Sequence, residues 1–114
     1  MKLFFSVIVV MVISVSFGQN QTTNTVLFAQ CMFEIEDRNA MNHLSESIAS
    51  NPYIEMVRLD HNTQRALIFT HNLDTLSDEE FRSWFGEFSE TVYCIQIGVK
   101  GVDSMNPYPF TNCQ

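Results

Sequence analysis

The feature that most constrains the fold is a helix signal in the second half of the chain, LSDEEFRSWFGEF at 76–88. Ser77 and Glu80 form a capping box, and the acidic residues after Ser77 lie at the positive end of the helix dipole. Aromatic residues then recur at helical spacing: Phe81, Trp84, Phe85 and Phe88. This pattern predicts a helix over about 78–90, whose aromatic stripe packs into a core and does not hold a cofactor.

The remaining segments predict one more helix and four strands. Asp37 can cap a helix over 38–50, which Asn51-Pro52 would end. Apolar runs at 26–35, 53–59, 65–70 and 92–99 have the character of strands. The order β-α-β-β-α-β is the ferredoxin-like plan. We therefore expect an α+β sandwich over 26–100, with a four-stranded antiparallel sheet, both helices on one face, and a C-terminal tail at 101–114.

The N-terminus has the layout of a secretory signal peptide over residues 1–18. Lys2 precedes an apolar run, and the small residues Ser16 and Gly18 stand before a plausible cleavage at Gln19. The run is short for a membrane span, although an uncleaved anchor is the alternative. The expected product is an exported protein, periplasmic or extracellular, that has a loose lead-in at 19–25 and no membrane association after cleavage.

The charge of the chain limits its partners. Thirteen acidic and six basic residues give a net charge of −7. Such a surface repels phosphate backbones, so nucleic-acid binding is not expected. We therefore expect the partner to be a protein of the envelope or the extracellular space, whose identity the sequence does not give.

Two segments resemble the heavy-metal-associated domain, the small ferredoxin-like module of copper chaperones and metal-pumping ATPases. They are LSESIASNPYIEMVRLDHNTQRALIFT at 44–70 and LSDEEFRSWF at 76–85. The family's Met-x-Cys-x-x-Cys metal site would place its cysteines at the positions of Asp37 and Ala40. Because neither residue can supply a thiolate, the resemblance implies the fold without metal transfer. The chain would then be a degenerate module of this kind, with no cofactor.

Other chemistry finds little support in the sequence. Met32 and Cys94 could form an alternative soft-metal site, for copper or a similar ion. The histidines His43, His61 and His71 lie on separate predicted elements, which favours surface roles. No Gly-rich phosphate loop, serine elbow or paired-carboxylate motif occurs, so we expect no enzymatic activity.

The sheet face without helices is unusually apolar for a surface. Its expected residues are Phe28, Gln30, Met32, Met56, Leu67, Phe69, Cys94 and Gln96. Monomers rarely expose patches beyond a few hundred Å², so a cover or partner is expected. The candidate binding residues on this face are Phe28, Met32, Leu67 and Phe69.

The tail offers that cover, because MNPYPF supplies Met105, Tyr108 and Phe110. We expect a Cys94–Cys113 disulfide to fix the tail across the sheet, leaving Cys31 as a buried thiol. A closed loop of about 18 residues would contribute roughly 3 kcal/mol. The alternative pairing is Cys31–Cys94, although the predicted side-chain directions of these residues disagree.

Overall fold

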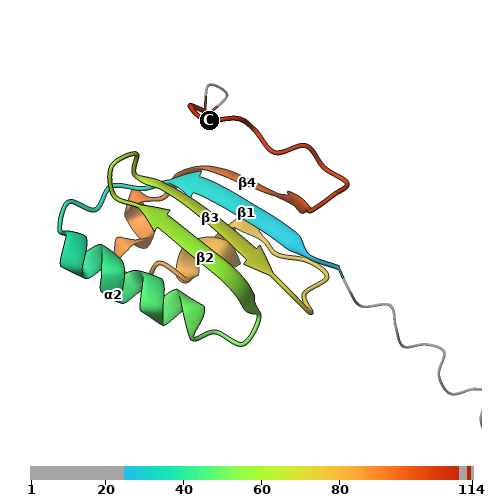
Figure 1. The fold of residues 1–114 in the computed structure, drawn as a ribbon, viewed down its shortest axis with the longest axis horizontal. Helices are drawn as coiled ribbons and strands as arrows, with labels where there is room; N and C mark the ends of the chain where they lie inside the picture. Colours follow the sequence, from blue (N-terminus) through green and yellow to red (C-terminus); the bar gives the residue numbers. More distant parts are fainter. Residues whose placement is uncertain (1–24, 111–112, 114) are drawn as a thin grey trace, which may run out of the picture.

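The computed structural model describes residues 25–110 and Cys113 (Figure 1). The signal segment predicted at 1–18 lies outside the described residues, as does most of the lead-in. Within the described part, no helix is both long and apolar enough to cross a bilayer. The elements in chain order are β1 (Leu27–Met32), α2 (Arg38–Ala49), β2 (Ile54–Asp60), β3 (Arg65–Thr70), α3 (Asp78–Ser83), the 3₁₀ helix η2 (Gly86–Thr91) and β4 (Tyr93–Val99).

The four strands form one antiparallel sheet in the order β2-β3-β1-β4. This order and the sequence of elements define a ferredoxin-like α+β fold, as predicted. The two central strands are β1 and β3, and the edges are β2 and β4. Helices α2 and α3 pack on the same face of the sheet, and the chain after β4 turns back along the sheet (Figure 1).

Helix α2 begins where the sequence predicts. The Asp37 side chain accepts hydrogen bonds from the backbone N–H groups of Asn39 and Ala40. These two donors would otherwise lack partners in the first turn. The buried stripe of α2, which faces the sheet, consists of Met41, Leu44 and Ile48.

The second helix differs from the prediction of one continuous helix over about 78–90. Ser77 caps α3 by accepting from Glu80 N–H at 3.0 Å, but α3 ends at Ser83 and is followed by η2. The physical reason is Gly86, which has a φ of +56°. This left-handed conformation is typical of a glycine that ends a helix. The aromatic stripe still reaches the core, because Phe81 and Phe85 are fully buried.

One core fills the space between the sheet and the helices. Side chains of β1 and β3 that point to the helices meet α2, α3 and the start of β4. Its buried members are Ala29, Cys31, Phe33, Ile35, Met41, Leu44, Ile48, Ala66, Ile68, Phe81, Phe85 and Val92. The sequence places Phe28, Gln30 and Met32 on the helix-free face, which leaves the alternate residues of this run to point inward, and the burial of Ala29, Cys31 and Phe33 confirms this assignment.

The opposite, helix-free face contains one ring that is fully buried without help from the helices. Phe28 packs over Gly98, its antiparallel partner on β4. A Cβ placed on Gly98 would lie 2.8 Å from Phe28 Cζ and 2.9 Å from Asp103 Cβ. Glycine is therefore required here for steric space, since any side chain would displace the ring or the turn after β4.

Candidate functional site

The predicted disulfide between Cys94 and Cys113 is present and anchors the end of the tail to strand β4. The two Cα atoms are 4.6 Å apart. Cys94 lies in an irregular part of the ladder, where Tyr93 pairs with Met32 and Gln96 pairs with Gln30. Two residues of β4 thus lie opposite one of β1, which is a β-bulge. Cys94 takes the left-handed conformation there, with a φ of +58°.

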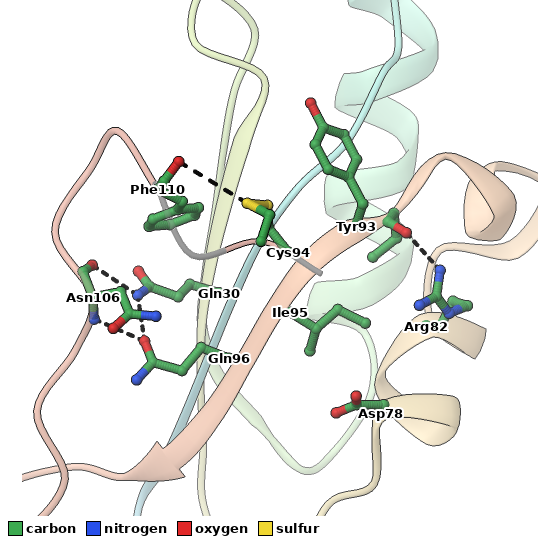
Figure 2. Close-up of a pocket in the computed structure, with 11 residues that line it drawn as sticks. Gln30, Asp78, Arg82, Tyr93, Cys94, Ile95, Gln96, Asn106 and Phe110 are labelled. Atoms are coloured by element: carbon green, nitrogen blue, oxygen red, sulfur yellow. Dashed lines mark hydrogen bonds between the residues drawn. A yellow bond between two sulfur atoms is a disulfide. The ribbon is translucent and has the colours of Figure 1, made fainter.

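Side-chain amides hold the middle of the tail against the sheet (Figure 2). Gln30 donates from Nε2 to Gln96 Oε1 at 2.8 Å and to the Asn106 carbonyl at 2.9 Å. Gln96 Oε1 also accepts from Asn106 N–H at 2.8 Å, and Gln96 Nε2 donates to the Ser104 carbonyl at 2.9 Å. Because Gln30 is only 4% exposed, these bonds compensate for the burial of its amide.

The aromatic residues of the tail contribute less cover than the sequence suggested. Met105 and Tyr108 remain 38% and 42% exposed. The Arg65 guanidinium lies 4.9 Å from the centroid of the Tyr108 ring, and this ring makes an edge contact with Phe110. The tail is therefore held by amides, a disulfide and a cation–π contact more than by apolar burial.

A pocket of about 450 Å³ lies beside β4, between this tail and helix α3 (Figure 2). Its floor consists of Val92 and the first part of the edge strand β4, residues 93–96. One wall consists of Asn106, Phe110 and Cys113, and the other carries Asp78 and Arg82. The Arg82 side chain donates to the backbone carbonyls of Val92 and Ser89, so it supports the start of β4.

The candidate binding residues do not all remain accessible. Met32, Leu67 and Phe69 are half-buried, and the Phe69 ring lies 4.6 Å from Lys100 Nζ. Phe28 is fully buried between Gly98 and the following turn, so its proposal as a binding residue was wrong for this conformation. The sequence pattern assigned Phe28 to the correct face but gave no sign that the turn after β4 would cover it.

The soft-metal alternative meets an obstacle at Cys94. Its sulfur is bonded to Cys113, so it offers no thiolate to pair with Met32 unless the disulfide is reduced. Over residues 25–110 and Cys113, no group of three or more His, Cys, Asp or Glu side chains is placed to hold a metal ion. His61 and His71 hydrogen-bond through Nε2 to the carbonyls of Glu36 and Pro52, both at 2.8 Å.

The β1–α2 loop is fastened to the β2–β3 hairpin. Gln64 accepts from Ile35 N–H at 2.6 Å and donates to the carbonyls of Ile35 and His61 at 3.0 and 2.7 Å. Gln64 itself has a φ of +56°. The structure thus holds this loop with an amide side chain, while Asp37 serves as the helix cap.

The remaining cysteine, Cys31, is a buried free thiol. Burial raises its pKa to about 12, against a smaller lowering by the Arg82 guanidinium. Thiols react as thiolates, so Cys31 is unsuited to nucleophilic or metal chemistry at neutral pH. Sequence reasoning placed Cys31 in the core, and the structure puts it at 0% exposure.

The Cys31 pKa predicts a loss of stability at alkaline pH. Above pH 9 the unfolded chain gives up the thiol proton, while the folded chain keeps it until about pH 12. The free energy of unfolding is therefore expected to fall by about 1 kcal/mol between pH 9 and pH 10 through this group. Urea titrations of the protein and of Cys31→Ala check this, and equal pH dependence in the two would contradict it.

Comparisons with known proteins gave one fold-level likeness. No family model matches the chain, and no curated protein matches it. A solved structure described as the apo form of the HMA domain of the copper chaperone for superoxide dismutase is similar at 17% identity and a TM-score of 0.48. The match covers 81% of this chain and 88% of that one.

Proposed function

We propose that the protein is an exported, non-enzymatic module that binds another protein of the envelope or the extracellular space. The observation that carries this proposal is the pocket beside β4, whose wall is a tail bonded covalently to the strand. A disulfide fits an oxidising compartment. A cleft built from an edge strand and a fixed segment is suited to recognition.

The chemistry of the pocket supports binding over catalysis. Among its lining residues, Asp78 is the one carboxylate and Arg82 the one guanidinium, and Arg82 is engaged with carbonyls. The two lining cysteines are joined in the disulfide, and no histidine lines the pocket. A nucleophile with a neighbouring base, which covalent catalysis requires, has no candidate in this lining.

Position-specific cross-linking in the native host tests the binding function. A photoreactive residue in place of Tyr93, which lines the pocket, is expected to give a discrete covalent adduct with one envelope or secreted protein. The control is the same replacement at Tyr53, because the two tyrosines are 41% and 46% exposed and Tyr53 lies outside the pocket. Equal adducts at both positions, or none at Tyr93, would count against the proposal.

Two further measurements separate the remaining parts of the proposal. Export predicts a mature N-terminus at Gln19 in the secreted or periplasmic fraction, which mass spectrometry reads directly. Copper(I) titration of the reduced and oxidised protein tests the alternative of a divergent soft-metal binder using Cys94 and Met32. Stoichiometric binding tighter than about 1 μM would favour that alternative.

A further inference from the structure

We infer that the outer edge of β4 accepts an extended, basic peptide segment of the partner, which adds a fifth strand to the sheet beside Ile95 and Ile97. This inference rests on the proposed function and names the chemistry of its partner. Edge strands present unpaired backbone donors and acceptors, and several peptide-binding domains use such an edge for recognition. Strand β4 is one of the two edges of this sheet.

The ladder shows which backbone groups of β4 face outward. Lys100 N–H donates to the Val26 carbonyl at 2.8 Å, and the pairs Phe28–Gly98 and Gln30–Gln96 follow in register. In an antiparallel pair, hydrogen-bonded and non-bonded positions alternate. Even-numbered residues of β4 therefore bond to β1, and the N–H and C=O groups of Ile95 and Ile97 point to the outer edge.

The part of this edge that is open to an added strand is short, because hydrogen bonds close one end and a β-bulge closes the other. Val99 N–H donates to Asp103 Oδ2 at 2.8 Å, and the Val99 carbonyl accepts from the N–H groups of Val102 and Asp103. At the other end, the bulge at Cys94 interrupts the regular ladder. Among the described residues, neither Ile95 nor Ile97 takes part in the backbone hydrogen bonds made outside the strands and helices.

The pocket lies directly beside this open edge of β4, so it has room for the side chains of an added strand. Ile95 and Gln96 are part of the pocket floor, with Asn106 and Phe110 on one wall and Asp78 on the other (Figure 2). A strand places alternate side chains on opposite faces. One set would meet the amide and ring of the tail, and the other set would meet Asp78.

Charge selects the occupant of the edge. The chain carries a net charge of −7, and Asp78 is exposed at the pocket, while the Arg82 guanidinium is held by carbonyls. The Arg82 guanidinium keeps its positive charge, so the preference for basic side chains comes from the net negative charge of the chain, with the exposed Asp78 as the nearest carboxylate of the pocket. A second copy of this chain is disfavoured, because it would bring an equally acidic surface to the same edge.

Amide hydrogen exchange with synthetic peptides tests the inference. The probe is a blocked heptapeptide of alternating valine and lysine, added to the oxidised protein, and its counterpart carries glutamate in place of lysine. Saturation with the lysine peptide is expected to slow exchange at Ile95 and Ile97 by about tenfold. The comparison is the other sheet edge, β2. The β2–β3 register points the backbone N–H groups of Val57 and Leu59 to that edge, and their exchange should change less than about twofold.

Charge variants complete the test. Asp78→Asn is expected to weaken the lysine peptide about two- to fivefold, as for one exposed ion pair. Glu79→Gln is the matched control, since Glu79 lies in the same first turn of α3 but outside the pocket, and it should leave the affinity unchanged. The glutamate peptide should bind at least about tenfold more weakly than the lysine peptide.

Three outcomes would overturn the inference. The first is protection from hydrogen exchange at Val57 and Leu59 without protection at Ile97. The second is equal affinity for the two peptides. The third is protection of Ile97 in the free protein, together with a dimer in sedimentation. Such a result combined with a specific Tyr93 adduct would reject strand addition and keep the proposed binding function. Loss of both the adduct and the peptide effect would reject both.

Discussion

Replacement of Phe85 with alanine is expected to lower the free energy of unfolding by about 3–5 kcal/mol. The Phe85 ring is fully buried between elements that are distant in the sequence. Its centroid lies 5.5 Å from Phe81 in an edge-to-face arrangement and 6.4 Å from Phe33. Truncation would remove these contacts and leave a cavity beneath the sheet, which the rigid surroundings can fill only in part.

The loss at Phe85 is large beside the total stability of a domain of this size, about 5–15 kcal/mol. Urea unfolding followed by tryptophan fluorescence measures it as a lower midpoint with an unchanged slope. The matched control is Tyr53→Ala, because Tyr53 is an aromatic residue that is 46% exposed, and the expected change there is below about 1 kcal/mol. A loss below about 1.5 kcal/mol at Phe85 would contradict a close-packed core at this position.

Removal of the Cys94–Cys113 disulfide is expected to cost about 3 kcal/mol. The double variant Cys94→Ser with Cys113→Ser tests this, since the bridge spans a sequence separation of 19. In the chain-entropy account, the bridge lowers the entropy of the unfolded chain. In the folded chain the described part of the tail would then be held by non-covalent contacts, chiefly the bonds of Gln30 and Gln96 to Ser104 and Asn106 and the Arg65–Tyr108 contact.

Unfolding with and without a dithiol reductant separates the disulfide from other effects of the substitutions. Reductant should lower the urea midpoint of the natural protein toward that of the double variant and leave the variant unchanged. Cys31→Ala is the control, since it keeps the bridge and should remain sensitive to reductant. Loss of the bridge should also make the peptide bond after Phe110 an early site of chymotrypsin cleavage. A double variant within about 1 kcal/mol of the natural protein would contradict the prediction.

Local patterns in the sequence were sufficient for most of the fold. The capping residues Asp37 and Ser77 both start helices as predicted. The apolar alternation of β1 gave the buried face correctly, because a side-chain period of two leaves little choice when one face is covered. The signal for the early end of α3 was also present, as Gly86 directly follows Trp84 and Phe85, but the aromatic periodicity continues to Phe88 and hid it.

The candidate site was predictable only in its covalent part. The Cys94–Cys113 bridge follows from side-chain direction and from the position of the tail. The amide network does not, because the path of the tail, which no local pattern encodes, brings Asn106 to the cross-strand pair of Gln30 and Gln96. The bulge at Cys94 and the left-handed Gln64 are likewise set by tertiary contacts. Local propensities depend on residues that are close in the sequence, whereas these features depend on residues that are close only in the folded structure.

The short open stretch of β4 has a consequence for aggregation. Long, flat, apolar edges recruit further copies of themselves and grow into fibrils, and proteins prevent this with bulges and short edges. Here the bulge at Cys94 and the Asp103 carboxylate at Val99 N–H close both ends, so β4 offers no template for continuous strand stacking. The bulge and the carboxylate would fix the register of one added strand. They also prevent a second molecule from extending the sheet continuously at β4.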